Sequence, residues 1–89
     1  MQQMSKYRIT FARSARRELE VLDDAIVRRV FPAIESLASN PRPSGCLKLR
    51  GSKTLWRIRV GSHRVIYSIQ DEEKVVDVVA VRHRSIAYR

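Results

Sequence analysis

In the C-terminal half of the chain, apolar and polar residues alternate with the period of a β-strand. The segment 55–60 reads Leu-Trp-Arg-Ile-Arg-Val, which places Arg57 and Arg59 on one face and the three apolar neighbours on the other. Gly61-Ser62 is typical of a tight hairpin turn. The turn predicts that the segment 63–69 returns antiparallel beside 55–60, so one face of a sheet carries fixed positive charge.

The N-terminal half shows the spacing of amphipathic helices. A short strand is predicted over 7–11, where aromatic and β-branched residues alternate. Apolar residues then recur every three or four positions, which predicts a helix over 14–22 with Ser14 as its N-cap. A second apolar stripe predicts a longer helix that starts after a turn and N-cap at Asp23-Asp24 and ends at the Pro-rich loop 40–45.

The order of these elements favours one α+β domain. Pro32 lies inside the second helical stripe and predicts a kink or a break, although the stripe keeps its phase and indicates one helix. Further strands are predicted over 46–50 and 75–81. We therefore expect a two-layer fold, in which an N-terminal strand and an αα-hairpin pack on an antiparallel sheet of about four strands. A chain this short has room for a single domain, 1–89.

The positive charge is concentrated in the second half of the chain. The formal net charge is +9, and residues 42–89 hold eleven Lys or Arg against four Asp or Glu. This asymmetry indicates a polyanion or an acidic protein as partner. The single cysteine, Cys46, excludes an internal disulfide and a cysteine-based zinc site. No apolar run approaches the ~20 residues of a membrane span, and the N-terminal residues do not resemble a signal peptide, so we expect a cytoplasmic protein with no membrane partner.

The strand arginines are candidates for phosphate binding. Arg57 and Arg59 share a strand face, and Arg64 is predicted to join them two residues past the turn. A guanidinium group can bind two phosphate oxygens at once, and it stays charged at every physiological pH. This face therefore fits a phosphodiester backbone. Lys48 and Arg50 are predicted to extend the face. The alternative is a solvated strand edge with scattered arginines.

Titratable side chains follow the last predicted strand. His83 can exchange protons near neutral pH, and the phenol of Tyr88 can do so where cations lower its pKa, or can stack on a base. Arg82 and Arg84 flank the histidine and add positive charge. The alternatives are a strand-end histidine without a chemical role and an aromatic residue that closes the core.

The remaining composition argues against metal and cofactor chemistry. The carboxylates form no cluster suited to Mg²⁺, and two histidines without a close acid or cysteine make a poor zinc site. The chain has only three glycines, so it contains no glycine-rich phosphate-binding loop. We therefore expect no metal and no cofactor. Cleavage of a phosphodiester would then rely on attack by the substrate's own 2′-hydroxyl, which specifies RNA and requires cations on the phosphate, a base and an acid.

Several short motifs follow one another in a fixed order in the second half of the chain. They are Leu47-Lys-Leu-Arg-Gly51, Trp56-Arg-Ile-Arg59, Arg64-Val-Ile-Tyr67 and Val81-Arg-His-Arg-Ser-Ile-Ala-Tyr-Arg89. With the order of the predicted elements, they resemble the RelE/ParE superfamily of bacterial type II toxin–antitoxin toxins over about 7–89. The His-Arg-x-x-x-Tyr-Arg ending is more similar to the RelE branch, which comprises endoribonucleases that enter the ribosomal A site and cut translated mRNA, whereas the ParE branch inhibits DNA gyrase.

The resemblance implies roles for individual residues. Arg57 and Arg59 match strand residues that contact phosphate and assist the attacking hydroxyl, and Arg64 matches the arginine that stabilises the transition state. Either Arg82 or His83 matches the basic residue near the leaving group, and Tyr88 matches the tyrosine that stacks on the substrate base. Arginine is a poor base, so His83, Tyr88 as phenolate, or no protein base at all stay open as alternatives. The implied catalytic residues are Arg59, Arg64, Arg82, His83 and Tyr88, and the implied RNA-binding residues are Lys48, Arg50, Arg57 and Arg84.

The function implied by the resemblance is a toxin that inhibits translation as a metal-independent, ribosome-dependent mRNA endonuclease. Its partners would be the ribosomal A site with mRNA and a cognate antitoxin, whose acidic or amphipathic segment covers the basic face. One alternative is a ParE-like toxin that inhibits gyrase by protein contact, without nuclease activity. The other is a basic module that binds RNA or protein and has no activity.

Overall fold

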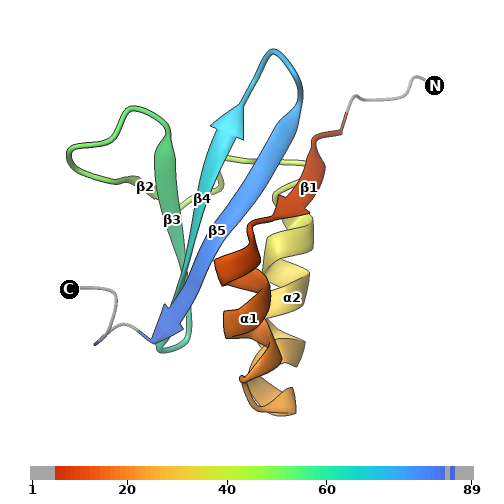
Figure 1. Cartoon of the computed structure of the whole chain (residues 1–89). Coiled ribbons are helices and arrows are strands. Elements are labelled where there is room, and N and C mark those ends of the chain that lie inside the picture. Colours follow the sequence, from red (N-terminus) through yellow and green to blue (C-terminus); the bar gives the residue numbers. More distant parts are fainter. Residues whose placement is uncertain (1–5, 84, 86–89) are drawn as a thin grey trace.

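Two helices cover one face of a five-stranded sheet in the computed structural model, which describes residues 6–83 and 85 (Figure 1). The predicted two-layer α+β fold is confirmed. The elements are β1 (Arg8–Phe11), α1 (Arg13–Glu20), α2 (Asp24–Ser36), β2 (Leu47–Lys48), β3 (Leu55–Val60), β4 (His63–Gln70) and β5 (Val75–His83).

The sheet has the strand order β1-β5-β4-β3-β2. Strands β2 to β5 form the predicted antiparallel meander, whereas β1 pairs parallel to β5. The first strand therefore adds a parallel edge to the predicted sheet of about four strands. Its direction follows from the connections, because the αα-hairpin returns the chain and the three reversals between β2 and β5 then leave β5 running the same way as β1.

The core lies between the helices and one face of the sheet. Helix α2 contributes the fully buried Val30 and Ile34, and its C-cap residue Leu37 is also fully buried; all three follow the predicted apolar stripe. They pack with sheet residues that include the fully buried Val65 and Tyr67. Because the helices cover this face alone, the opposite face of the sheet is left for polar side chains.

Helix α2 is continuous through its proline. It runs from Asp24 to Ser36 with Pro32 inside it, so the predicted single helix is confirmed and the predicted break does not occur. Pro32 is exposed, and its ring therefore displaces no core residue. The proline still removes the N–H that would bond to the carbonyl oxygen of Arg28 one turn earlier.

The predicted N-cap of the first helix is wrong. Helix α1 begins at Arg13 with Ala12 in the N-cap position, and no side chain caps it. The Ser14 hydroxyl donates instead to the carbonyl oxygen of Val79 in β5, at 2.8 Å. A tertiary partner on the sheet has thus replaced the local capping bond that the sequence favoured.

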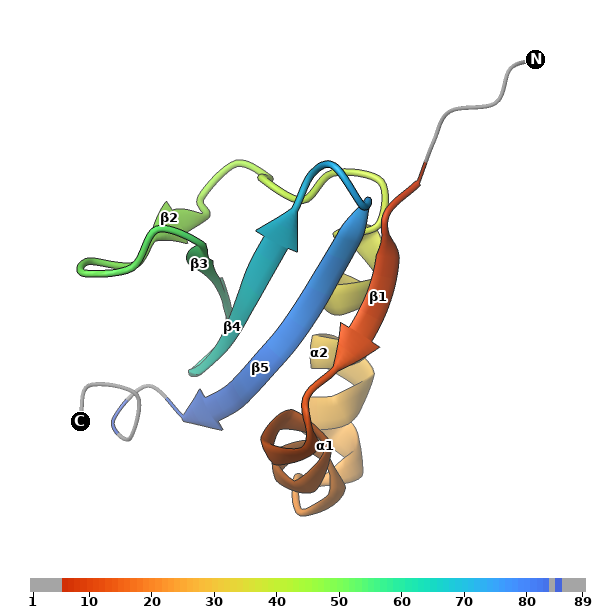
Figure 2. The same cartoon turned by 45° about the horizontal axis from the view of Figure 1, so that its top comes forward.

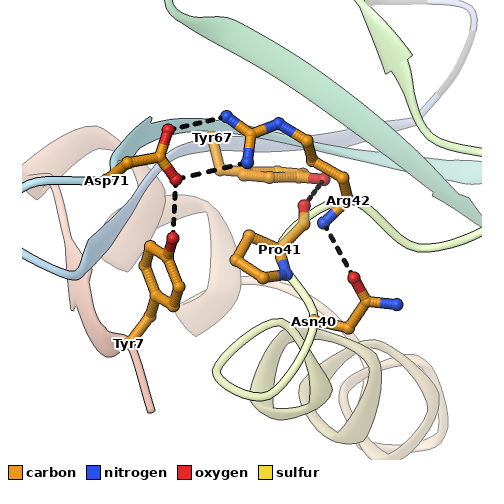
Figure 3. Close-up of polar contacts among 6 residues, drawn as sticks. All are labelled: Tyr7, Asn40, Pro41, Arg42, Tyr67 and Asp71. Atoms are coloured by element: carbon orange, nitrogen blue, oxygen red, sulfur yellow. Dashed lines mark hydrogen bonds and ion pairs between the residues drawn. The ribbon is translucent and has the colours of Figure 1, made fainter. Parts of the chain in front are cut away.

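A polar network joins three connecting segments at one end of the sheet (Figure 3). Arg42, in the loop after α2, donates through both terminal nitrogens to Asp71 in the β4–β5 turn, at 3.2 and 2.9 Å. The Tyr7 hydroxyl donates to the same carboxylate at 2.6 Å. The hydroxyl of the buried Tyr67 donates to the carbonyl oxygen of Pro41 at 2.8 Å. The network fixes the Pro-rich loop against the sheet.

The network shifts the pKa values of its members. Hydrogen bonds from Arg42 and then from Tyr7 lower the pKa of the Asp71 carboxyl to about 2. The bond to that carboxylate raises the pKa of Tyr7. Burial, more than any other cause, raises the pKa of Tyr67. Asp71 is therefore the member of the network that changes charge in acid, and its protonation removes the ion pair with Arg42.

Candidate nucleic-acid interface

Three arginines stand side by side on the face of the sheet that the helices leave open. Arg59 on β3 lies directly opposite Arg64 on β4, and Arg64 lies directly opposite Arg82 on β5. The neighbouring cross-strand pair, Ile58 and Val65, belongs to the core, so strand alternation directs the arginines away from it. We call Arg59, Arg64 and Arg82 the arginine row.

The row is an arrangement that folding alone does not favour. Like charges directly opposite one another destabilise a sheet, and neighbouring Cβ atoms in such pairs lie only about 5 Å apart. Arg64, in the middle, is 7% exposed, whereas Arg59 is exposed. Places where a fold accepts a local cost of this kind are expected to be functional. Three arginines at neighbouring positions on adjacent strands form a site suited to a phosphate-rich ligand.

Arg57 extends the row along β3. It occupies the next open-face position, opposite Ile66, and is half-buried. The predicted sharing of one face by Arg57, Arg59 and Arg64 is therefore confirmed. Together with Arg82 they form a positive strip that follows β3 and crosses β4 to β5.

A bulge in β5 decides which residue completes the row. Ile66 pairs with Ala80 but Tyr67 pairs with Val78, so Val79 has no partner residue on β4. The extra residue reverses the alternation of β5 beyond it. As a result Arg82 faces the open side, where strict alternation from Asp77 would have placed His83.

His83 lies on the opposite face from the arginine row. It is paired with His63, the two rings meet edge to face with centroids 5.4 Å apart, and its Nδ1 lies 2.9 Å from the hydroxyl oxygen of Ser85. His63 is 8% exposed and lines a cavity with Arg29 on the helix side. Burial, and next the charge of His83, lowers the pKa of His63. The register therefore places the His83 imidazole, one of the alternatives for the base, away from the strand arginines.

The other predicted binding residues are more dispersed. Lys48 pairs with Trp56, so it lies on the face opposite Arg57 and does not extend the strip. Arg50 is exposed in the turn between β2 and β3. Arg84 and Tyr88 lie outside the described residues.

Glu18 on α1 contacts the end of the row, and the sequence interpretation missed it. Helix α1 lies along the part of β5 that β1 does not reach (Figure 2). The Oε1 atom of Glu18 accepts a hydrogen bond from the backbone N–H of Val81, and its Oε2 atom accepts one from Nε of Arg82, both at 2.8 Å. The available signal was the four-residue spacing from Ser14, which places both polar side chains on one helix face.

The described part of the chain offers no metal site, since residues 6–83 and 85 contain no group of three or more His, Cys, Asp or Glu suited to a metal. No helix in these ranges is long and apolar enough to cross a membrane. What the site supplies is fixed cationic hydrogen-bond donors. Arginine does not release its proton at physiological pH, so the row can stabilise negative charge but cannot act as a base.

Comparison with known proteins identifies the family. Residues 9–88 match the family model for the ParE toxin of the type II toxin–antitoxin system parDE. The chain is 35% identical over 88 residues to a RelE-like toxin protein of Escherichia coli, covering 93% of this chain and 90% of that protein. The chain is a toxin of the RelE/ParE family. It is also 32% identical over 84 residues to the toxin RelG of Mycobacterium tuberculosis, covering 93% and 97% of the two chains.

Solved structures agree with this assignment. The RelE–RelB complex of the archaeon Pyrococcus horikoshii superposes on this toxin with a TM-score of 0.78 at 30% identity, covering 91% of this chain and 97% of that one. The RelBE2 complex of Mycobacterium tuberculosis gives the same score and identity, with coverages of 89% and 99%. The predicted family and its RelE-like branch are confirmed, and the toxin belongs to a type II toxin–antitoxin system.

Proposed function

We propose that this toxin is a metal-independent endoribonuclease that cuts translated mRNA in the ribosomal A site. The observation that carries the proposal is the arginine row, Arg59–Arg64–Arg82, on the uncovered face of the sheet. The RelE-like relatives support the same reading. Because its target is the translating ribosome, the toxin would act in the cytoplasm.

The proposed reaction is attack by the substrate's own 2′-hydroxyl. The O2′ oxygen forms a bond to phosphorus, the P–O5′ bond breaks, and the products are a 2′,3′-cyclic phosphate and a 5′-hydroxyl. The proton of the 2′-hydroxyl passes to a base, and the leaving O5′ takes up a proton from solvent water. Negative charge builds on the phosphate oxygens in the transition state, and the row stabilises it there. Loss of one such donor costs about 100- to 1000-fold in rate in comparable sites.

Proton transfer is assigned by exclusion within the row. Guanidinium groups cannot accept the proton of the 2′-hydroxyl. The place of His83 beside His63, on the other face of the sheet, disfavours it as the base. Two alternatives are left, Tyr88 and catalysis without a protein base. Of these we propose Tyr88 as the base, with stacking on the substrate base as its alternative role, and Arg82 as the cation beside the leaving oxygen.

A cognate antitoxin is the second proposed partner. The relatives from Pyrococcus horikoshii and Mycobacterium tuberculosis were solved as toxin–antitoxin complexes. We propose that an acidic segment of the antitoxin covers the arginine row and so competes with RNA for it. A complex held by charge alone would dissociate in moderate salt, whereas an apolar contribution would survive it.

The test is primer extension on a reporter transcript after brief induction of the toxin. Breaks at fixed positions within codons are expected for the wild type and are expected to be lost with Arg59→Ala, Arg64→Ala and Tyr88→Phe. Arg28→Ala, which removes an exposed charge from α2, is the matched control and should keep full activity. Thermal unfolding of the buried Arg64→Ala variant separates loss of the site from loss of the fold.

Inhibition of DNA gyrase is the second candidate, because the matching family model describes ParE toxins. In that case induced cells would filament and show a DNA-damage response while the reporter transcript stays intact. Intact mRNA with arrested growth would reject the endonuclease proposal.

A further inference from the structure

We propose that Glu18 is a positioning residue that fixes the guanidinium of Arg82 within the arginine row. The inference rests on the proposed nuclease function and adds to it a residue from the helical layer. It concerns the direction in which one cation points rather than the presence of charge.

The geometry of the carboxylate supports this role. Its two oxygens have separate partners, since Oε1 accepts from the backbone N–H of Val81 and Oε2 accepts from Nε of Arg82, both at 2.8 Å. The backbone bond anchors the carboxylate to β5, so Oε2 is fixed before Arg82 binds it. Nε is the guanidinium nitrogen nearest the chain. The bond to Glu18 therefore leaves both terminal nitrogens of Arg82 for a ligand.

The degree of burial fits an orienting role better than a stabilising one. The Arg82 side chain is 42% exposed and that of Glu18 is 27% exposed. An ion pair this exposed contributes little to folding. It can still restrict an arginine side chain that is otherwise flexible, and transition-state stabilisation depends on donors that are already in place.

A carboxylate is also an unexpected neighbour for a surface that binds a polyanion. Its negative charge reduces the attraction between the row and phosphate groups. If the row served affinity alone, a neutral residue at this position would bind RNA better. Positioning gives Glu18 a role despite this cost, and it makes the two effects separable by experiment.

The substitution Glu18→Gln separates them. The amide oxygen can keep the bond to the Val81 N–H, which preserves the edge of β5. The amide nitrogen then faces Nε of Arg82, and two donors cannot bond. Glu20→Gln is the matched control, because it makes the same charge change on the same helix at an exposed position two residues away.

The experiment is single-turnover cleavage of mRNA on programmed ribosomes, with toxin concentration varied. For Glu18→Gln we expect a rate at saturation lower by about 10- to 100-fold, with half-saturation at the same or a lower toxin concentration. Glu20→Gln should cleave at the wild-type rate. In an Arg82→Ala background, Glu18→Gln should slow cleavage no further, because its effect passes through Arg82.

The outcomes distinguish this inference from the function on which it rests. Wild-type toxin that leaves mRNA uncut overturns both. Active wild type with equal rates for Glu18→Gln and Glu20→Gln overturns the role of Glu18 alone, as does a further loss in the Arg82→Ala background. The Nε–H resonance of Arg82 gives a readout without activity: it should shift in Glu18→Gln and stay unchanged in Glu20→Gln, and the reverse would reject the assigned contact.

Discussion

Arg42 and Asp71 meet through two parallel hydrogen bonds, at 3.2 and 2.9 Å, although they are far apart in sequence. The pair connects the Pro-rich loop after α2 to the β4–β5 turn (Figure 3). Both side chains are about half exposed, at 43% and 52%. Their geometry is bidentate, which favours a persistent pair even at the surface.

The pair predicts a component of acid unfolding. The pKa of Asp71 falls from an ordinary value of 3.8 to about 2 in the folded chain. Because the folded-state pKa is the lower one, the pair stabilises the fold above about pH 4, and this contribution is lost as the pH falls through 2. Urea unfolding measured from pH 5 to pH 2 should show that the free energy of unfolding decreases less in Asp71→Asn than in the wild type. Equal losses would contradict the shift.

The two network tyrosines should differ in their contribution to stability. Tyr67 is fully buried and donates to the carbonyl oxygen of the buried Pro41. Tyr67→Phe leaves that carbonyl without its donor and is expected to lower the free energy of unfolding by about 1–3 kcal/mol. Tyr7→Phe removes a hydroxyl bonded at the surface and should cost less. Urea denaturation of both variants, with m-values equal to that of the wild type, measures the two losses of unfolding free energy. A larger loss for Tyr7→Phe would contradict the prediction.

Replacing the proline in α2 should stabilise the toxin. Pro32→Ala restores a backbone donor one turn after Arg28 at an exposed position. An interior proline destabilises a helix by about 3 kcal/mol relative to alanine. Alanine also gives the unfolded chain more conformational freedom, which offsets about 0.4–1 kcal/mol of this gain. A net increase of about 2 kcal/mol in the free energy of unfolding is therefore expected. Glu35→Ala on the same helix serves as the control in thermal unfolding. A loss of stability would mean that the proline shapes the packing of α2.

RNA binding should depend on salt in proportion to the charges of the row. Each phosphate contact contributes about 0.7 to the slope of log affinity against log salt for single-stranded nucleic acid. Arg59→Ala should therefore reduce the slope by about that amount, whereas Arg28→Ala on α2 should leave it unchanged. Fluorescence anisotropy with a 2′-methoxy RNA, which cannot be cleaved, measures both. Equal slopes for the two variants would show that phosphate does not contact Arg59.

Local patterns predicted the part of the site that lies on the β3–β4 hairpin. Strict alternation placed Arg57 and Arg59 together, and the tight turn set the position of Arg64. Gly61 has φ of +60°, a conformation that favours glycine at this point of a two-residue hairpin. Period and turn chemistry are properties of neighbouring residues, which is why the sequence was sufficient here.

The choice between Arg82 and His83 could not be made from the sequence. The answer depends on Val79, the residue without a partner on β4. It lies in an apolar run in which no residue type marks the extra position, and the pairing with β4 decides it. Lys48 shows the same limit, because its face follows from pairing with Trp56. The role of Glu18 depends on how α1 docks against β5, which no local pattern contains.

The unequal length of β1 and β5 has a consequence for biogenesis. Beyond Phe11 the edge of β5 has no strand beside it, and Ser14 and Glu18 of α1 occupy its backbone groups instead. An unprotected strand edge is a template for joining two chains. Translation produces α1 long before β5, so the segment that shields this edge is already available when the strand emerges. Because α1 precedes β5 in the chain, we expect this edge to be covered as soon as the strand forms, which leaves no exposed edge for a second chain to join.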